Sequence, residues 1–306
     1  MCARSEPLAL SQTIAGRSVG AIVSPVGASL QRLGVDGMEL VCGDDAGPVA
    51  SSGAVLVPWP NRVRGGSWLL DGKPQQLEVT EPGAGNALHG LVATTPFAVT
   101  ARDDSSVRLE AGVRHPLGYP FDLDVVVSYR LEATGVRSSI TVVNRGAVAA
   151  PVAVGVHPYV RVSDAAAAHL LLEVDAEHTL LLGDDDLPLR LAPVDGTRFD
   201  LREPTALVEA PSHAAYTGLR SVDDRVRLRL IDRRSSDAVE VWADDRFGWA
   251  QVYVTRELPG LPAGGLAVAL EPMTAPPDAF NSGTDLHWLP PSSRWVRNWG
   301  IDLGRA

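Results

Sequence analysis

The sequence predicts an all-β protein, a large antiparallel β-sandwich that forms one domain over residues 1–306. Three observations support this prediction. The 29 glycines and 23 prolines recur along the whole chain, which is too often for long helices. The segments between them are short and rich in Val, Leu and Ile. No repeat, low-complexity linker or change in composition marks a domain boundary, and many short strands with turns between them are typical of a sandwich.

Several of these segments show the alternation of apolar and polar residues that is typical of half-buried strands. Residues 226–231 (Val-Arg-Leu-Arg-Leu-Ile) alternate in this way, and so do residues 239–242. Residues 138–144 and 151–156 are also predicted to be strands. We expect these last two strands to be neighbours that are joined by a turn at residues 144–146 (Asn-Arg-Gly).

One hairpin, one buried strand and one short helical segment complete the prediction. Asp71-Gly72 is a typical two-residue hairpin turn between short strands. The apolar run at residues 265–270 is predicted to form a buried strand that ends at Glu271. The only helical pattern covers residues 163–168, and it is brief.

Composition excludes several classes of partner. The net charge of −10 argues against nucleic acid and anionic membrane, because both require a basic surface. The apolar runs are too short for a transmembrane helix, and residues 1–6 lack the apolar region of a signal peptide. The two cysteines, Cys2 and Cys42, form no disulfide framework. We therefore expect a cytoplasmic protein with no membrane partner.

Four polar clusters occur among the strand-like segments, each braced by glycine or proline. They contain Asn61 and Arg62, His89, His157 and Tyr159, and Glu271. Each alone could be structural, as a surface arginine, a capped turn, a strand-end imidazole or a buried glutamate paired with Arg62. Four such clusters together favour a functional site.

Glu271 and His157 are the candidates for acid–base chemistry. A carboxylate at the end of an apolar strand is costly to place there unless it is paired or used. Pro272 biases Glu271 towards an extended backbone, so its side chain has a defined direction, as a general base requires. His157 ends another apolar strand, and Tyr159 lies on the same face if the segment stays extended.

Other chemistries lack the motifs that they require. No second histidine lies three or four residues from His89, His157 or Glu271, so no metal site is expected. The sequence contains neither a glycine-rich phosphate loop nor a Gly-x-Ser-x-Gly nucleophile elbow. The acidic run at residues 184–186 is predicted to be a solvated loop tip, with calcium binding as the alternative.

Taken in order, the polar clusters resemble the motifs of the aldose 1-epimerase family, also called galactose mutarotases. The matching segments are Asn61-Arg62 with Gly65 downstream, Asn86-x-Leu88-His89-Gly90, Gly155-x-His157-Pro158-Tyr159 and Glu271-Pro272-x-Thr274. The resemblance covers roughly residues 15–300. It implies a large antiparallel β-sandwich with a sugar cleft on a concave face. It also implies interconversion of the α and β anomers of a free aldose, with no cofactor.

The resemblance also implies roles for individual residues. Glu271 would be the base and His157 the acid. The residues that would bind the sugar are Asn61, Arg62, His89, Tyr159 and Gln251. His213 stands where the family usually has an aspartate that binds sugar hydroxyls, and a neutral imidazole accepts one hydrogen bond where a carboxylate accepts two. His213 is therefore a further candidate for substrate binding, with a preference other than galactose or a weak activity as the consequence.

Three alternatives remain open at the level of sequence. A hexose-6-phosphate 1-epimerase would need at least two basic residues around the cleft, and Arg64 and Arg102 are available. A non-catalytic carbohydrate-binding protein of the same fold would need no acid–base pair. A β-sandwich of unrelated function is the third alternative, because a fold alone fixes no chemistry. The expected partner is a small-molecule sugar, and the protein is expected to be a monomer or a homodimer.

Overall fold

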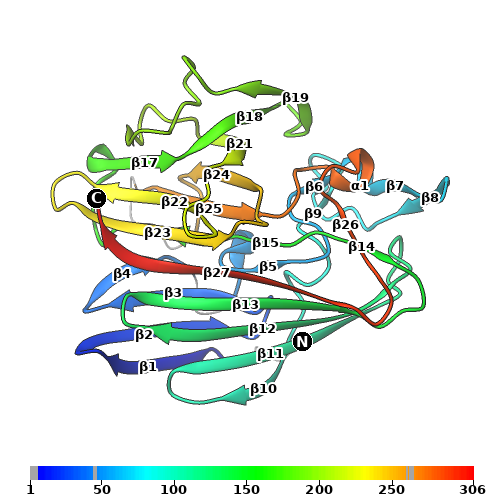
Figure 1. Cartoon of the computed structure of the whole chain (residues 1–306), viewed down its shortest axis with the longest axis horizontal. Coiled ribbons are helices and arrows are strands. Elements are labelled where there is room, and N and C mark those ends of the chain that lie inside the picture. Colours follow the sequence, from blue (N-terminus) through cyan, green and yellow to red (C-terminus); the bar gives the residue numbers. More distant parts are fainter. Residues whose placement is uncertain (1–5, 44–46, 260, 262–264) are drawn as a thin grey trace.

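The computed structural model describes residues 6–43, 47–259, 261 and 265–306, so the expectations for Cys2 and the first residues of the chain lie outside the described residues. Strands make up nearly all of the regular secondary structure in the described residues, and the predicted all-β antiparallel architecture is confirmed (Figure 1). Two large antiparallel sheets pack against each other. The apolar side chains between them form one continuous core.

The larger sheet contains twelve strands in the described residues, and it carries the candidate site. Its main path runs β1-β2-β3-β4-β16-β25-β24-β21-β18-β19, and β15 joins β25 to β5. The bounds are β1 Leu8–Ile14, β2 Arg17–Ser24, β3 Ser29–Val35, β4 Met38–Val41, β5 Val55–Leu56, β15 Gly155–Val156, β16 Tyr159–Val160, β18 Ala176–Leu182, β19 Pro188–Pro193, β21 His213–Leu219, β24 Trp249–Thr255 and β25 Ala267–Met273.

The second sheet has nine strands in the same part of the chain, in the order β10-β11-β12-β13-β27-β23-β22-β17-β20. The bounds are β10 Ala98–Arg102, β11 Ser106–Arg114, β12 Asp122–Glu132, β13 Gly135–Asn144, β17 Leu170–Val174, β20 Thr205–Ala206, β22 Arg225–Asp232, β23 Asp237–Asp244 and β27 Arg294–Arg305. Three two-stranded ribbons accompany the sheets: β6 (Arg62–Val63) with β9 (Ala87–Leu88), β7 (Ser67–Leu70) with β8 (Lys73–Gln76), and β14 (Ala150–Val152) with β26 (His287–Leu289).

The alternating segments form strands as predicted. Residues 226–231 lie in β22 and residues 239–242 lie in β23, and the apolar residues of β22 point into the core while its arginines point outward. The predicted hairpin is also confirmed. Asp71 and Gly72 connect β7 to β8, and both have positive φ angles (49° and 74°), as the favoured two-residue hairpin turn requires.

The predicted neighbours at residues 138–144 and 151–156 are wrong. The first segment lies in β13, which pairs with β12 and β27. The second divides between β14 and β15, which belong to other pairings. The side-chain amide of Asn144 donates to the carbonyls of Val148 and Leu289, so the chain turns towards β26 and does not fold back along β13.

The helical prediction at residues 163–168 is also wrong, apart from the short 3₁₀ turn η3 (Ala167–His169). Ser163 has a φ of 44°, a left-handed conformation that cannot continue a right-handed helix. The remaining helical turns are η1 (Val49–Ser51), η2 (Arg64–Gly66) and α1 (Ala279–Ser282). In the described residues, no helix has the length and apolar character needed to cross a bilayer.

The buried strand near residue 270 extends further than predicted. β25 continues to Met273, so Glu271 lies inside the strand and not at its end. The backbone N–H groups of Leu270 and Thr274 donate to the carbonyls of Pro158 and Val154. Pro272 lies between them and has no N–H to donate, and it faces the gap between β15 and β16 where the ladder is interrupted. This gap lets the strand tolerate the proline.

Candidate active site

Glu271 and Gln251 lie on the face of the larger sheet that points away from the core. In β25 the side chains of Val268 and Leu270 belong to the core, so Glu271 projects from the opposite face. Gln251 is the direct cross-strand partner of Glu271 on β24. Both side chains are nevertheless almost fully buried, at 2% and 1% exposure. Glu271 and Gln251 are therefore buried polar side chains on a sheet face that does not pack into the apolar core.

His157 comes to Glu271 because of the strand register. Gly155 opposes Met273, and Tyr159 opposes Ala269, so His157 lies opposite Glu271 in the interrupted part of the ladder. Its Nε2 is 3.4 Å from Oε1 of Glu271. The structure thus brings together the two residues that the sequence proposed as acid and base. They are too close for a sugar ring to lie between them.

Asn61 and His89 are fixed beside this pair by the β6–β9 ribbon. The N–H of His89 donates to the Asn61 carbonyl (2.9 Å), and the N–H of Asn61 donates to Nδ1 of His89 (3.2 Å). Because Nδ1 accepts, the proton of the neutral imidazole is on Nε2, which can donate to a ligand. Burial lowers the pKa of His89 well below its usual value, so the ring is neutral. Its ring centroid is 5.1 Å from that of His157.

Asn61 and His89, which flank this ribbon, hold unusual backbone conformations. Asn61 and His89 have φ angles of 56° and 60°, in the left-handed region that disfavours side chains. The next residue, Gly90, also has a positive φ, and a Cβ there would lie 2.4 Å from the Val57 carbonyl oxygen. Such strain is concentrated at functional sites, where the surrounding structure enforces it.

Arg62 links the site to two carboxylates that the sequence did not connect with it. Its Nε and Nη2 donate to Glu81 at 2.8 and 2.7 Å, a bidentate contact. Its Nη2 also lies 3.2 Å from Oδ2 of Asp186. The structural alternative, in which Glu271 is simply the ion-pair partner of Arg62, is therefore not what the structure shows. Arg62 acts on Glu271 only through its nearby charge.

The Glu271–His157 pair carries one proton at neutral pH. Burial raises the pKa of Glu271 to about 8, against the opposing positive charge of Arg62. Burial also lowers the pKa of His157 to about 4. The proton therefore lies on the carboxyl in the ligand-free protein, whereas the sequence analysis expected it on His157. The difference arises because burial disfavours the charged form of both groups.

Three buried polar atoms at the site have no hydrogen-bond partner in the described part of the chain. They are Oε2 of Glu271, Nδ1 of His157 and Nε2 of Gln251. The side-chain amide of Asn61 donates to Oε1 of Gln251 at 3.5 Å, which leaves the Gln251 amide nitrogen as a donor. Buried polar groups are rarely left unsatisfied, so a cluster of exceptions requires an explanation. This mixture of donors and acceptors suits hydroxyl groups, which both donate and accept.

Tyr159 and Tyr253 form the apolar side of the site. The ring of Tyr159 lies 5.1 Å from that of His157, and the tyrosine is buried. Burial, together with the nearby charge of Glu271, raises the pKa of Tyr159, so its hydroxyl remains protonated. Tyr253 opposes His213 in the β21–β24 pairing, and their rings are 5.4 Å apart. Tyr253 was not predicted as a site residue.

His213 lies at the site, where it contacts Asp186. Its Nδ1 is 2.9 Å from Oδ1 of Asp186. Burial lowers the pKa of His213, and the Asp186 carboxylate opposes this shift. The prediction of a solvated loop tip at residues 184–186 is confirmed, since Asp184 and Asp185 are exposed, but Asp186 also contacts Arg62 and His213. Nothing in the described chain groups three or more histidine, cysteine, aspartate or glutamate side chains in a way that could hold a metal ion.

Neither of the basic residues considered for a phosphate group is free beside the pair. Arg102 lies on β10, at the edge of the smaller sheet, where it donates to the carbonyl of Ala9 on β1. Arg64 is half-exposed and lies 3.6 Å from both Asp185 and Asp278. The cation next to Glu271, Arg62, is already paired.

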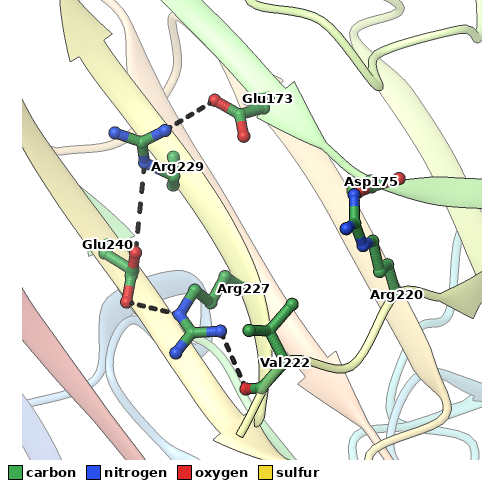
Figure 2. Close-up of a pocket in the computed structure, with 7 residues that line it drawn as sticks. All are labelled: Glu173, Asp175, Arg220, Val222, Arg227, Arg229 and Glu240. Atoms are coloured by element: carbon green, nitrogen blue, oxygen red, sulfur yellow. Dashed lines mark hydrogen bonds and ion pairs between the residues drawn. The ribbon is translucent and has the colours of Figure 1, made fainter. Parts of the chain in front are cut away.

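Away from this site, a polar hollow lies on the outer face of the smaller sheet, with a volume of about 280 Å³ (Figure 2). Its lining residues are Glu173, Asp175, Arg220, Val222, Arg227, Arg229 and Glu240. Its charges pair with one another across the strands (Figure 2). Arg229 contacts Glu173 at 2.9 Å, Arg227 contacts Glu240 at 3.2 Å, and Arg220 contacts Asp175 at 3.5 Å. Among the described residues that line this hollow, none has a buried polar atom without a partner.

Comparison with known sequences agrees with the motifs. The model of the aldose 1-epimerase family matches residues 11–299. The uncharacterized protein YihR of Escherichia coli K12 is 33% identical over 277 residues, which cover 90% of this chain and 87% of that protein. Galactose mutarotase of Homo sapiens is 30% identical over 166 residues, covering 51% of this chain and 46% of that protein.

Solved structures share the architecture. A GalM/aldose epimerase homologue from C. elegans superimposes with a TM-score of 0.83 at 18% identity, covering 98% of this chain and 99% of that one. Galactose 1-epimerase from Lactobacillus acidophilus NCFM gives a TM-score of 0.75 at 16% identity, with 98% and 99% covered. At these identities the likeness concerns the fold alone. The match of the family model to nearly the whole chain shows that this protein belongs to the aldose 1-epimerase family.

Proposed function

We propose that this protein interconverts the α and β anomers of a free aldohexose, such as glucose or galactose, by general acid–base ring opening. The observation that carries the proposal is the buried Glu271–His157 pair, with Nε2 and Oε1 3.4 Å apart and one proton, on the Glu271 carboxyl, for the two groups. The Gln251 amide nitrogen, which has no partner among the described residues, and the His89 ring, with its proton on Nε2, lie beside it. Together these groups can orient and open a sugar ring.

The geometry suits the two oxygens that react. Ring opening removes a proton from the C1 hydroxyl and gives one to the ring oxygen, and both oxygens are bonded to C1. Two protein groups that lie side by side can therefore reach both oxygens from one edge of the sugar. We propose that Glu271 takes the hydroxyl proton and His157 supplies the ring-oxygen proton. Rotation about C1–C2 in the open form, followed by closure with the roles reversed, gives the other anomer.

This assignment needs the proton of the pair to move from Glu271 to His157 when the sugar binds. The positive charge of Arg62 favours the ionised carboxylate and so assists this transfer. Hydrogen bonds from sugar hydroxyls to Oε2 would act in the same direction. A positioned acid or base typically contributes ~10²–10⁴-fold, which is enough for a reaction that already proceeds in water.

The charges around the pair favour a neutral sugar over a hexose 6-phosphate. Arg62 is balanced by Glu81 and also faces Asp186, so it does not present an unmatched positive charge to a phosphate dianion. An acid–base pair also has no role in a protein that only binds sugar. These two arguments support the free-aldose epimerase over both rivals.

Polarimetry on freshly dissolved α-glucose and α-galactose tests the proposal. We expect the protein to accelerate the approach to anomeric equilibrium well above the buffer rate, and to act more slowly on glucose 6-phosphate than on glucose. Faster exchange of the phosphate ester would favour the rival epimerase. Sugar binding in calorimetry without faster anomer exchange would contradict the catalytic proposal.

A further inference from the structure

The loop between β18 and β19 holds the carboxylate of Asp186 in a defined position. This hairpin lies at the edge of the larger sheet (Figure 1). The N–H of Gly183 donates to the Leu187 carbonyl (2.9 Å), and the N–H of Asp186 donates to the Gly183 carbonyl (3.0 Å). Leu187 is buried and anchors the loop, while Asp186 adopts a left-handed conformation with φ 57°. The direction of the Asp186 side chain is therefore set by the loop.

Asp186 contacts two site residues that come from different parts of the fold. Its Oδ2 lies 3.2 Å from Nη2 of Arg62, and its Oδ1 lies 2.9 Å from Nδ1 of His213. Arg62 in turn is close enough to Glu271 for its charge to lower the pKa of that carboxyl. One side chain therefore separates Asp186 from the reacting pair. Asp186 therefore lies directly beside two of the residues that are expected to bind the sugar.

Asp186 is not needed to neutralise Arg62. The bidentate contact with Glu81 already balances that charge. A carboxylate has about four acceptor positions, and the contacts with Arg62 and His213 use two of them. The side chain of Asp186 is 41% exposed, whereas that of Glu271 is 2% exposed. Asp186 thus combines a fixed position with open acceptor capacity.

We propose that Asp186 binds hydroxyl groups of the substrate. The β18–β19 loop positions its carboxylate against His213 on β21. This inference rests on the proposed function, since the hydroxyls are those of a free aldose. It also accounts for the histidine at position 213. The carboxylate expected there comes from a separate loop, and His213 and Arg62 hold it in place.

The test compares Asp186→Asn with Asp184→Asn. Asp184 is an exposed residue of the same loop, so its substitution makes the same change in net charge away from the site. We expect Asp186→Asn to raise KM for glucose about 10- to 100-fold with kcat changed less than about threefold, as the loss of a hydrogen bond to a charged group predicts. Asp184→Asn should match the wild type. Thermal unfolding of both variants checks that they fold.

A set of 2-, 3-, 4- and 6-deoxyglucose separates binding from a merely structural role. In the wild type, kcat/KM should fall about 10- to 100-fold for the analogue that lacks the bound hydroxyl. In Asp186→Asn that selective loss should disappear, because the two changes remove the same interaction. An unchanged KM for Asp186→Asn, or identical losses across the analogues in both proteins, would overturn the inference.

Failure of the proposed function gives a different result. If the wild type accelerates no aldose, catalysis is rejected, and calorimetry with glucose then tests Asp186 directly. Weakening of glucose binding by at least about tenfold in Asp186→Asn, but not in Asp184→Asn, would still support the inference. Equal affinity in the two variants, or no binding to the wild type, would overturn it.

Discussion

Two polar regions of this protein, the Glu271 site and the hollow on β17, β22 and β23, differ in how their charges and hydrogen bonds are satisfied. Both lie on sheet faces that point away from the core, and both contain carboxylates with arginines nearby. In the hollow each lining charge has a partner of opposite sign. At the site, buried atoms of Glu271, His157 and Gln251 have no partner among the described residues.

The comparison shows that polarity and a concave surface do not by themselves indicate function. The ion pairs of the hollow are partly exposed, and pairs of this kind each contribute only about 0.2–1 kcal/mol to folding. The site instead keeps two titratable groups buried with strongly shifted pKa values. Unmet hydrogen-bonding capacity, together with such shifts, distinguishes the Glu271 site from the hollow and supports the function proposed for it.

The largest expected effect comes from Glu271→Gln. We expect kcat/KM for anomer exchange to fall by ~10²–10⁴-fold, because glutamine cannot take the proton, and His157→Asn should behave alike. Glu240→Gln makes the same change in the hollow and serves as the matched control, with activity unchanged. Polarimetry measures all three variants. Near-normal rates in Glu271→Gln, or a comparable loss in Glu240→Gln, would break the distinction between the two regions.

The pH dependence of kcat/KM should follow the shared proton of the site. Below about pH 4 His157 is protonated as well as Glu271, so the pair carries two protons and no base remains. Above about pH 8 Glu271 loses the only proton and no acid remains. The rate should be flat between these limits and fall about tenfold per pH unit beyond each, after subtraction of the uncatalysed rate. A profile that follows one group of ordinary histidine pKa would contradict the shared-proton account.

An intermediate effect is expected from Arg62→Lys. Lysine cannot reproduce the planar, bidentate contact of Arg62 with Glu81, so the positive charge at position 62 would no longer be held in place at the site. We expect a loss of about tenfold in kcat/KM, mostly through KM. Arg229→Lys alters an arginine of the hollow and should leave both kinetic constants unchanged. Equal effects of the two substitutions would show that the ion pairs of Arg62 are structural only.

The smallest effect concerns stability. Glu240→Gln removes a charge that contacts Arg227 and Arg229, and should lower the free energy of unfolding by about 1 kcal/mol or less. Glu271→Gln should not lower it at pH 7, because Oε2 has no partner to lose. The pKa of Glu271 is raised on folding, so its stabilising contribution is complete below pH 4.5 and disappears as the pH rises through about 8.

Urea denaturation at pH 5 and pH 9 measures both variants against the wild type. Relative to the wild type, Glu271→Gln should gain stability between the two pH values, since the variant has no carboxyl to ionise. A destabilised Glu271→Gln at both pH values would show that the buried carboxyl contributes to folding as the charges of the hollow do.

The sequence indicated the proposed acid–base pair but not the partners of Arg62. Glu271 and His157 occur in ordered motifs beside prolines, which are visible in one dimension. Glu81 and Asp186 lie in separate loops, and only the folded chain brings them to Arg62. The position of the shared proton was also missed, because it depends on how deeply each group is buried.

The fold shows the same division between local and distant information. Alternation within residues 226–231 and the Asp71-Gly72 turn are local, and both were predicted correctly. The neighbours of β13 and the end of β25 depend on strands far away in the sequence. The opposition of His157 and Glu271 likewise follows from a register that involves distant residues, so the motifs indicated the pair but not its geometry.

The most direct test of the central claim is a crystal structure of the protein with glucose bound. The account predicts that the C1 hydroxyl lies within hydrogen-bonding distance of the Glu271 carboxylate and that the ring oxygen lies within reach of Nε2 of His157. Glucose bound elsewhere, or bound nearby with its C1 edge turned away from both side chains, would contradict the claim that this pair opens the sugar ring.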